Sequence, residues 1–172
     1  DIHSDVVADD YKPFTPDEVW QLMEEEIEPL VGKTVIRLSS TEKGGGVSMQ
    51  IPHEVNLMRE KGIDMHWLVA HPVDDAFVVT KKMHNIAQNV AGPGVEFTEE
   101  DAAIHREFGR SNFEGMKDWV DYFITADVYI FEDPQLVGML PELRAANPDA
   151  EFIFRNHINT NRDLMAQEGT PQ

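Results

Sequence analysis

Four short apolar runs separated by helical stretches constrain the fold of this chain more than any other feature. The runs span residues 33–38, 65–70, 127–131 and 151–155. Each has the length and the apolar centre that are typical of strands buried in a parallel sheet. The stretches between them have helical composition, at residues 47–61, 77–87 and 136–146. This alternation predicts an α/β fold, an open and mostly parallel sheet with helices on both faces.

A helix is also expected before the first strand. The segment from Thr15 to Glu18 fits a capping box with Pro16 at the first helical position, which predicts a helix over residues 16–30. Residues 1–14 have no sustained periodicity, so they either lie on the domain or form a disordered arm. We therefore expect residues 1–32 to be an N-terminal extension and helix, and residues 33–172 to be the α/β domain.

Two more helical segments are predicted in the second half of the chain. Thr98 begins an acidic, capped helix that reaches about Phe108, and residues 116–123 are expected to form a separate helical turn. In the first half, Pro52 lies inside the helix predicted over residues 47–61. An interior proline disfavours a helix, so this helix either kinks at Pro52 or has its first turn near it.

Composition excludes several classes of partner and site. The 172 residues include 32 acidic and 14 basic residues, for a formal net charge of -18, which argues against nucleic acid and anionic membranes as partners. An acidic solvated surface and adaptation to high salt are both compatible with this charge. The absence of cysteine excludes disulfides and suits a reducing cytoplasm. No apolar run approaches the ~18 residues that a spanning helix needs, so we expect a cytoplasmic protein.

Three consecutive glycines, Gly44 to Gly46, follow the first strand and precede a helix. Such a loop can bind an anion, because free backbone N–H groups and the helix dipole both point toward the ligand. An ordinary structural turn explains the same residues equally well. The pattern is neither the dinucleotide fingerprint nor a P-loop, and the spacing alone leaves the choice open.

Polar side chains gather where the later strands are predicted to end. They are Asp133, Gln135, Arg155, His157 and Asn159. The carboxyl ends of parallel strands share one edge of an open sheet, and ligands bind at that edge. A binding site is therefore predicted there, beside the glycine loop. The sequence shows no metal-ligand spacing and no nucleophile elbow, so we expect no metal and no resident cofactor.

Taken in order, several motifs resemble one family. They are Gly44-Gly45-Gly46-Val47, Val79-Thr80-Lys81-Lys82-Met83-His84-Asn85, Asp133-Pro134-Gln135 and Arg155-Asn156-His157-Ile158-Asn159. They resemble the N-terminal half of glycosyltransferring trehalose synthases, which belong to the retaining glycosyltransferases with two Rossmann-like domains (GT-B). Retaining trehalose phosphorylases of the fungal type have similar motifs. The resemblance covers residues 15 to 165.

The resemblance implies transfer of glucose from UDP- or ADP-glucose to glucose, giving trehalose with retention at the donor carbon. By this analogy His157 is the catalytic residue beside the reacting glucosyl group. The backbones of Gly45, Gly46 and Val47 would approach the donor. The residues implied to contact the sugar or line the acceptor pocket are Lys81, His84, Asn85, Asp133, Gln135, Arg155 and Asn159. From spacing alone, His84 and Asn85 would equally be an ordinary pair on a helix surface.

Two departures limit the analogy. The family motif usually has aspartate where this chain has Asn159. The C-terminal nucleotide-binding domain of the family is absent from this sequence, which also stops before the last expected strand of its own domain. We therefore expect that the chain alone does not turn over. The alternatives are a retaining trehalose phosphorylase domain, a non-catalytic sugar-binding module and a stable domain without a ligand. The sequence leaves a homodimer open.

Overall fold

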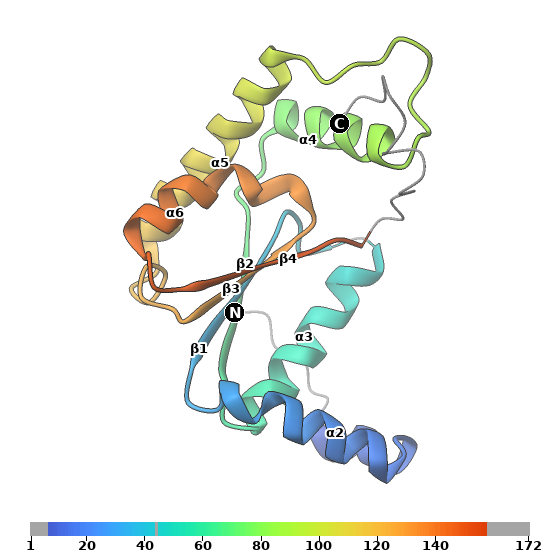
Figure 1. The fold of residues 1–172 in the computed structure, drawn as a ribbon, viewed down its shortest axis with the longest axis vertical. Coiled ribbons are helices and arrows are strands. Elements are labelled where there is room, and N and C mark those ends of the chain that lie inside the picture. The colour runs from blue at the N-terminus through green and yellow to red at the C-terminus, as the bar shows by residue number, and fades with distance from the viewer. Residues whose placement is uncertain (1–6, 44, 158–172) are drawn as a thin grey trace.

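The computed structural model of the chain describes residues 7–43 and 45–157. Its centre is a four-stranded sheet in which all neighbouring strands are parallel (Figure 1). The strands are β1 (Thr34–Ser39), β2 (Asp64–Val69), β3 (Val128–Glu132) and β4 (Glu151–Arg155). Their spatial order is β2-β1-β3-β4, and Val35 is in register with both Met65 and Val128. The predicted parallel α/β sheet is confirmed.

Helices cover both faces of this sheet (Figure 1). They are α3 (Gly45–Glu60) on one face, and α4 (Asp74–Ala87), α5 (Glu99–Trp119), the 3-10 helix η3 (Pro134–Met139) and α6 (Leu140–Ala146) on the other. Strand side chains alternate between the faces. In β1, Val35 packs with Ile51 of α3, whereas Ile36 and Leu38 join the larger core with Phe108 of α5. Each face therefore has its own apolar core.

The N-terminal segment packs along the α3 side of the domain. It comprises α1 (Ala8–Tyr11), η1 (Lys12–Phe14), α2 (Asp17–Ile27) and η2 (Glu28–Leu30). The backbone N–H of Ala8 donates to Glu60 Oε2 at 2.8 Å, which ties α1 to the end of α3. The predicted helix before β1 is confirmed, but its capping box is wrong. Pro16 occupies the N-cap, and the Thr15 hydroxyl donates instead to the Tyr11 carbonyl at 3.0 Å.

The predicted break in the second half of the chain is also wrong. α5 runs without interruption from Glu99 to Trp119, and it includes Gly109 and Gly115. The helix comes so close to η3 that a Cβ at Gly109 would lie 2.2 Å from the carbonyl carbon of Gly138. Glycine here is a packing requirement rather than a helix end. Thr98 caps this helix as predicted, since its hydroxyl accepts from the Asp101 N–H.

Two smaller points refine the prediction. Pro52 lies inside α3 and not in its first turn. The segment predicted as one helix over residues 136–146 starts earlier, as the 3-10 helix η3, and becomes α-helical at Leu140. Among residues 7–43 and 45–157, no helix has both the length and the apolar character needed to cross a membrane.

Candidate functional site at the carboxyl edge of the sheet

The strand order places a cavity where ligands bind in open α/β sheets. From β1 the chain passes through α3 to β2 on one side, while β3 pairs with β1 on the other. The loops that leave β1 and β3 therefore diverge, and such a switch point forms a crevice at the carboxyl ends of the strands. A cavity of about 210 Å³ lies there. Its lining residues are Ser39, Ser40, Thr41, Gly45, Val47, Ser48, Glu132, Asp133 and Gln135.

The glycine loop contributes one wall of this cavity. Gly45 begins α3 with φ of 79°, a left-handed conformation that favours glycine. Gly45 and Val47 line the cavity, whereas Gly46 is exposed beside it. A Cβ at Gly45 or Gly46 would meet no atom within 4 Å, so the space in front of this turn is open. Gly44 lies outside the described residues.

Asp133 forms the opposite wall in a strained backbone conformation. Its φ of 64° and ψ of 173° belong to a region that side-chain-bearing residues rarely adopt. Two hydrogen bonds hold it there. Its N–H donates to the Arg155 carbonyl at 2.9 Å, and its Oδ1 accepts from the His157 N–H at 2.9 Å. Strained backbone conformations cluster at functional sites. Asp133 fits this pattern, because it lines the cavity.

A buried network of charges lies beneath the cavity. Arg37, in the middle of β1, donates from Nε to Glu132 Oε1 at 2.8 Å and also pairs with Glu54 of α3. The side chains of Arg37 and Glu132 are each only 1% exposed. Arg155 Nη1 lies 3.4 Å from Glu54 Oε2 and 3.9 Å from Glu132 Oε1. Two guanidinium groups thus face two carboxylates, and this pairing offsets the cost of removing the charges from water.

His157 is attached to this network. Its Nε2 contacts the Oε2 of Glu132, the carboxylate oxygen that does not accept from Arg37 Nε. Since its N–H also donates to Asp133, the residue is held at two points. The structure therefore brings together Asp133, Arg155 and His157, three of the polar residues predicted at the strand ends. Asn159 lies outside the described residues.

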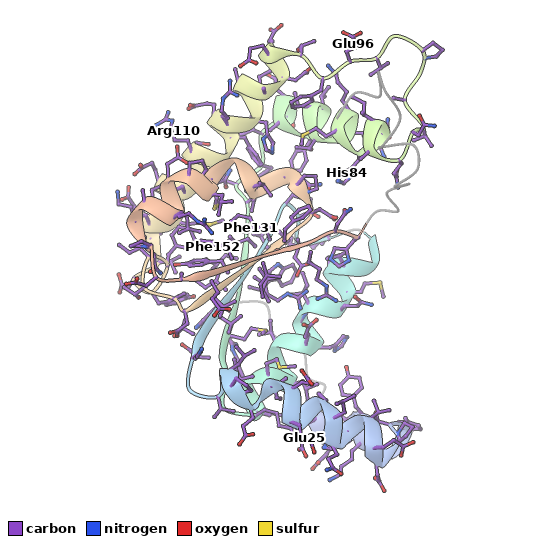
Figure 2. All side chains as sticks on the ribbon, in the orientation of Figure 1. Glu25, His84, Glu96, Arg110, Phe131 and Phe152 are labelled. Atoms are coloured by element: carbon purple, nitrogen blue, oxygen red, sulfur yellow. The ribbon has the colours of Figure 1, made fainter. Side chains whose placement is uncertain are left out.

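The predicted site residues on α4 approach from the side. His84 lies on the side of α4 that faces the strand ends (Figure 2), and its Nε2 is 3.5 Å from the Gln135 amide nitrogen. Partial burial lowers the pKa of His84 and Lys81 lowers it further, against an opposing effect of Asp133. Lys81 is exposed. Asn85 is partly buried, and its carbonyl accepts from the N–H of Val90.

Three residues of the network were missed by sequence reasoning: Arg37, Glu54 and Glu132. A signal for one of them was present, because Arg37 stands alone within an apolar run that is otherwise suited to burial. A buried arginine requires a buried acidic partner. The identity of that partner depends on which strands are neighbours. Within residues 7–43 and 45–157, no group of three acidic or histidine side chains could hold a metal ion.

The chain was compared with known families and proteins. The family model described as "Trehalose synthase, N-terminal domain" matches residues 37–169. A trehalose phosphorylase of Pleurotus pulmonarius is 32% identical over 139 residues, which are 78% of this chain and 18% of that protein. A trehalose synthase of Thermococcus litoralis is 30% identical over 151 residues, 88% of this chain and 34% of that protein. A trehalose synthase of Rubrobacter xylanophilus is 28% identical over 159 residues, which are 91% of this chain and 37% of that protein.

This chain thus spans well under half the length of the curated relatives that it matches. The family match begins at Arg37 within β1 and covers the strands and helices that follow, including all of the buried charge network. It also includes the glycine loop and the strand ends that form the cavity. The chain belongs to the family of trehalose synthase N-terminal domains.

Proposed function

We propose that this chain is the acceptor-side domain of a retaining GT-B glycosyltransferase, which makes trehalose from a nucleotide-glucose donor and glucose. The observation that carries the proposal is the cavity at the carboxyl ends of β1 and β3, with His157 held next to it by the buried network. The catalytic protein would also contain a nucleotide-binding domain, which would form the other side of the cleft. In this proposal the chain alone does not turn over.

The cavity wall formed by α3 suits the anionic part of a donor. α3 has sixteen residues, and its first N–H groups have no partner within the helix. The dipole of a helix favours negative charge at this end, so the backbones of Gly45, Gly46 and Val47 are proposed to approach the donor diphosphate. The open space in front of Gly45 and Gly46 allows that approach.

The opposite wall suits sugar hydroxyls. Asp133 and Gln135 line the cavity, and a carboxylate and an amide can accept hydrogen bonds from hydroxyl groups. We assign both to the acceptor pocket, with His84 reaching it through Gln135. Lys81, Asn85, Arg155 and Asn159 are proposed as further contacts around the sugar. His157 is proposed to lie beside the reacting glucosyl group.

In this mechanism no protein side chain attacks the donor. The leaving phosphate assists deprotonation of the acceptor hydroxyl, which attacks on the same face, so the configuration of the donor carbon is retained. The contribution of this chain would be positioning of the acceptor and electrostatic stabilisation of developing charge. Metal ions are not part of the proposal.

A retaining trehalose phosphorylase is the second candidate. It is supported by the relatives, because two trehalose phosphorylases are 32% identical to this chain and a trehalose synthase is 30% identical. In that reaction one glucosyl group of trehalose is transferred to phosphate, which gives glucose 1-phosphate and releases glucose. The two candidates share the acceptor-side domain and differ in the group that is bound opposite it.

The test uses the complete protein that contains this chain. UDP- or ADP-glucose with glucose should yield trehalose, whereas phosphate with trehalose should yield glucose 1-phosphate only if the protein is a phosphorylase. Replacing His157 by Ala should abolish most of the turnover in either case while changing the unfolding midpoint little. Full activity of His157→Ala, or no sugar transfer with any of these substrates, would contradict the proposal.

A further inference from the structure

The imidazole of His157 has two inequivalent nitrogens in this structure. Nε2 contacts the buried carboxylate of Glu132, whereas Nδ1 has no hydrogen-bond partner within the part of the chain that the structure describes. The side chain of His157 is 21% exposed, and that of Glu132 only 1%. One ring nitrogen is thus bound inside the protein, and the other makes no hydrogen bond to the described residues.

The direction of the inner hydrogen bond follows from Glu132. The guanidinium groups of Arg37 and Arg155 both lie against its Oε1, and positive charge at this distance favours the carboxylate form, which can only accept. The imidazole must then donate from Nε2. In its neutral form the ring has one N–H, and when that proton is on Nε2, Nδ1 carries a lone pair and accepts.

We propose that Glu132, held in place by Arg37, is a positioning residue that fixes the Nε2–H tautomer of His157. Nδ1 is thereby presented as a hydrogen-bond acceptor to a hydroxyl group of the sugar substrate. The identity of this ligand rests on the proposed function, but the tautomer does not. Glu54 completes the arrangement, because it pairs with Nη1 of the same guanidinium that donates to Glu132.

The first test is the ¹⁵N NMR spectrum of the histidine rings in this chain. Protonated and unprotonated ring nitrogens have well-separated ¹⁵N shifts. The signals of His157 are identified by their loss in His157→Gln. At a pH where the ring is neutral, Nε2 is expected to have the shift of a protonated nitrogen and Nδ1 that of a bare one. A proton on Nδ1 would overturn the proposal.

The second test reverses the tautomer. In Glu132→Gln the amide oxygen takes the place of Oε1 beside Arg37, because Arg37 only donates. The amide NH₂ then faces His157 and donates to Nε2, so the proton moves to Nδ1. Glu151→Gln, on the exposed start of β4, is the matched control and should leave the His157 shifts unchanged. An unchanged tautomer in folded Glu132→Gln would overturn the proposal. If that variant does not fold, the wild-type spectrum decides the question.

The kinetic test uses the complete protein. Loss of a partner that orients an active-site group typically lowers activity by about 10- to 100-fold, and this range is expected for kcat/KM of Glu132→Gln. Glu132→Asp keeps an acceptor carboxylate and should recover part of the loss. A reversed tautomer with unchanged kcat/KM would overturn the role of Glu132. A wild-type protein with the Nε2–H tautomer but no sugar transfer would instead overturn the proposed function.

Discussion

The two faces of the sheet differ in what they bury. On the face toward α5 and α6 the strands bury apolar and aromatic side chains, among them Phe131 and Phe152 (Figure 2). The ring of Phe152 stacks on Tyr129 with a centroid distance of 5.3 Å. On the face toward α3 the same strands bury a smaller apolar core, which includes Val35, and in addition the charged Arg37 in the middle of β1 and Glu132 at the end of β3. The buried charges of the second face lie next to the candidate site, and Glu132 lines its cavity.

This difference has a physical reason. A dry apolar layer gains stability from every group removed from water, but it offers nothing that orients a polar ligand. Buried charges gain little stability, because pairing mainly offsets their desolvation. Their value lies in a fixed geometry at the cavity. The α5 face has the larger apolar core, and the α3 face carries the buried charges that contact His157.

The largest effect is expected from breaking the charged pair on the α3 face. Arg37→Ala leaves Glu132 buried without its main partner, and such a loss typically costs about 3–5 kcal/mol. The loss of stability is measured as the difference in the free energy of unfolding in urea between the wild type and Arg37→Ala. The double variant Arg37→Met with Glu132→Leu removes both charges and should recover much of the stability. If the single and double variants are equally unstable, the network acts by packing rather than by charge.

A packing defect on the other face should have the next largest effect. Gly109→Ala would place a Cβ 2.2 Å from the backbone of Gly138, and overpacking of this kind costs about 1–3 kcal/mol. Gly115→Ala is the control in the same helix, because its Cβ meets nothing within 4 Å. It should instead stabilise the domain by about 0.5–1 kcal/mol, since alanine favours a helix. Equal effects of the two substitutions would contradict the close approach of α5 and η3.

The smallest effect is expected at the rim of the α5 face, where α4 and α5 share an ion pair. Lys82 Nζ lies 2.6 Å from Asp101 Oδ2, and this contact together with the Thr98 N–H and hydroxyl lowers the pKa of Asp101 to about 2. The folded state therefore favours the carboxylate. Its stabilising effect is present above about pH 4, near the unfolded pKa of aspartate, and is lost as the pH falls to about 2.

This prediction is checked by urea unfolding of the wild type and Asp101→Asn between pH 5 and 2. The wild type should be the more stable protein at pH 5, and the difference should shrink as the pH falls. A difference that does not change with pH would show that Asp101 acts only as a helix cap.

Much of the fold could be predicted from local patterns. The first strand, expected over residues 33–38, is β1 (Thr34–Ser39), and the other three strands are displaced by at most about one residue from prediction. The break predicted after Phe108 is wrong, because α5 continues through Gly109, whose missing side chain allows the close contact with Gly138. The capping box failed because Pro16 took the N-cap.

The candidate site was predicted in part. Asp133, Arg155 and His157 were expected at one edge because strand ends are local features and parallel strands share their direction. The hydrogen bonds that Asp133 makes with Arg155 and His157 confirm that these residues are neighbours. Their roles in a reaction stay predictions. Glu54 and Glu132 were not expected, since neither side chain has a signal of its own in the sequence.

The sequence by itself determined the α/β class, the parallel direction of the strands and the edge at which polar residues gather. These depend on periodicities of a few residues and on the direction of the chain. Only the tertiary structure decided which charge neutralises which. Arg37 and Glu132 are 95 residues apart in the chain and meet because β3 is the neighbour of β1. Pairing of buried charges depends on distances in space, and strand order is what sets those distances here.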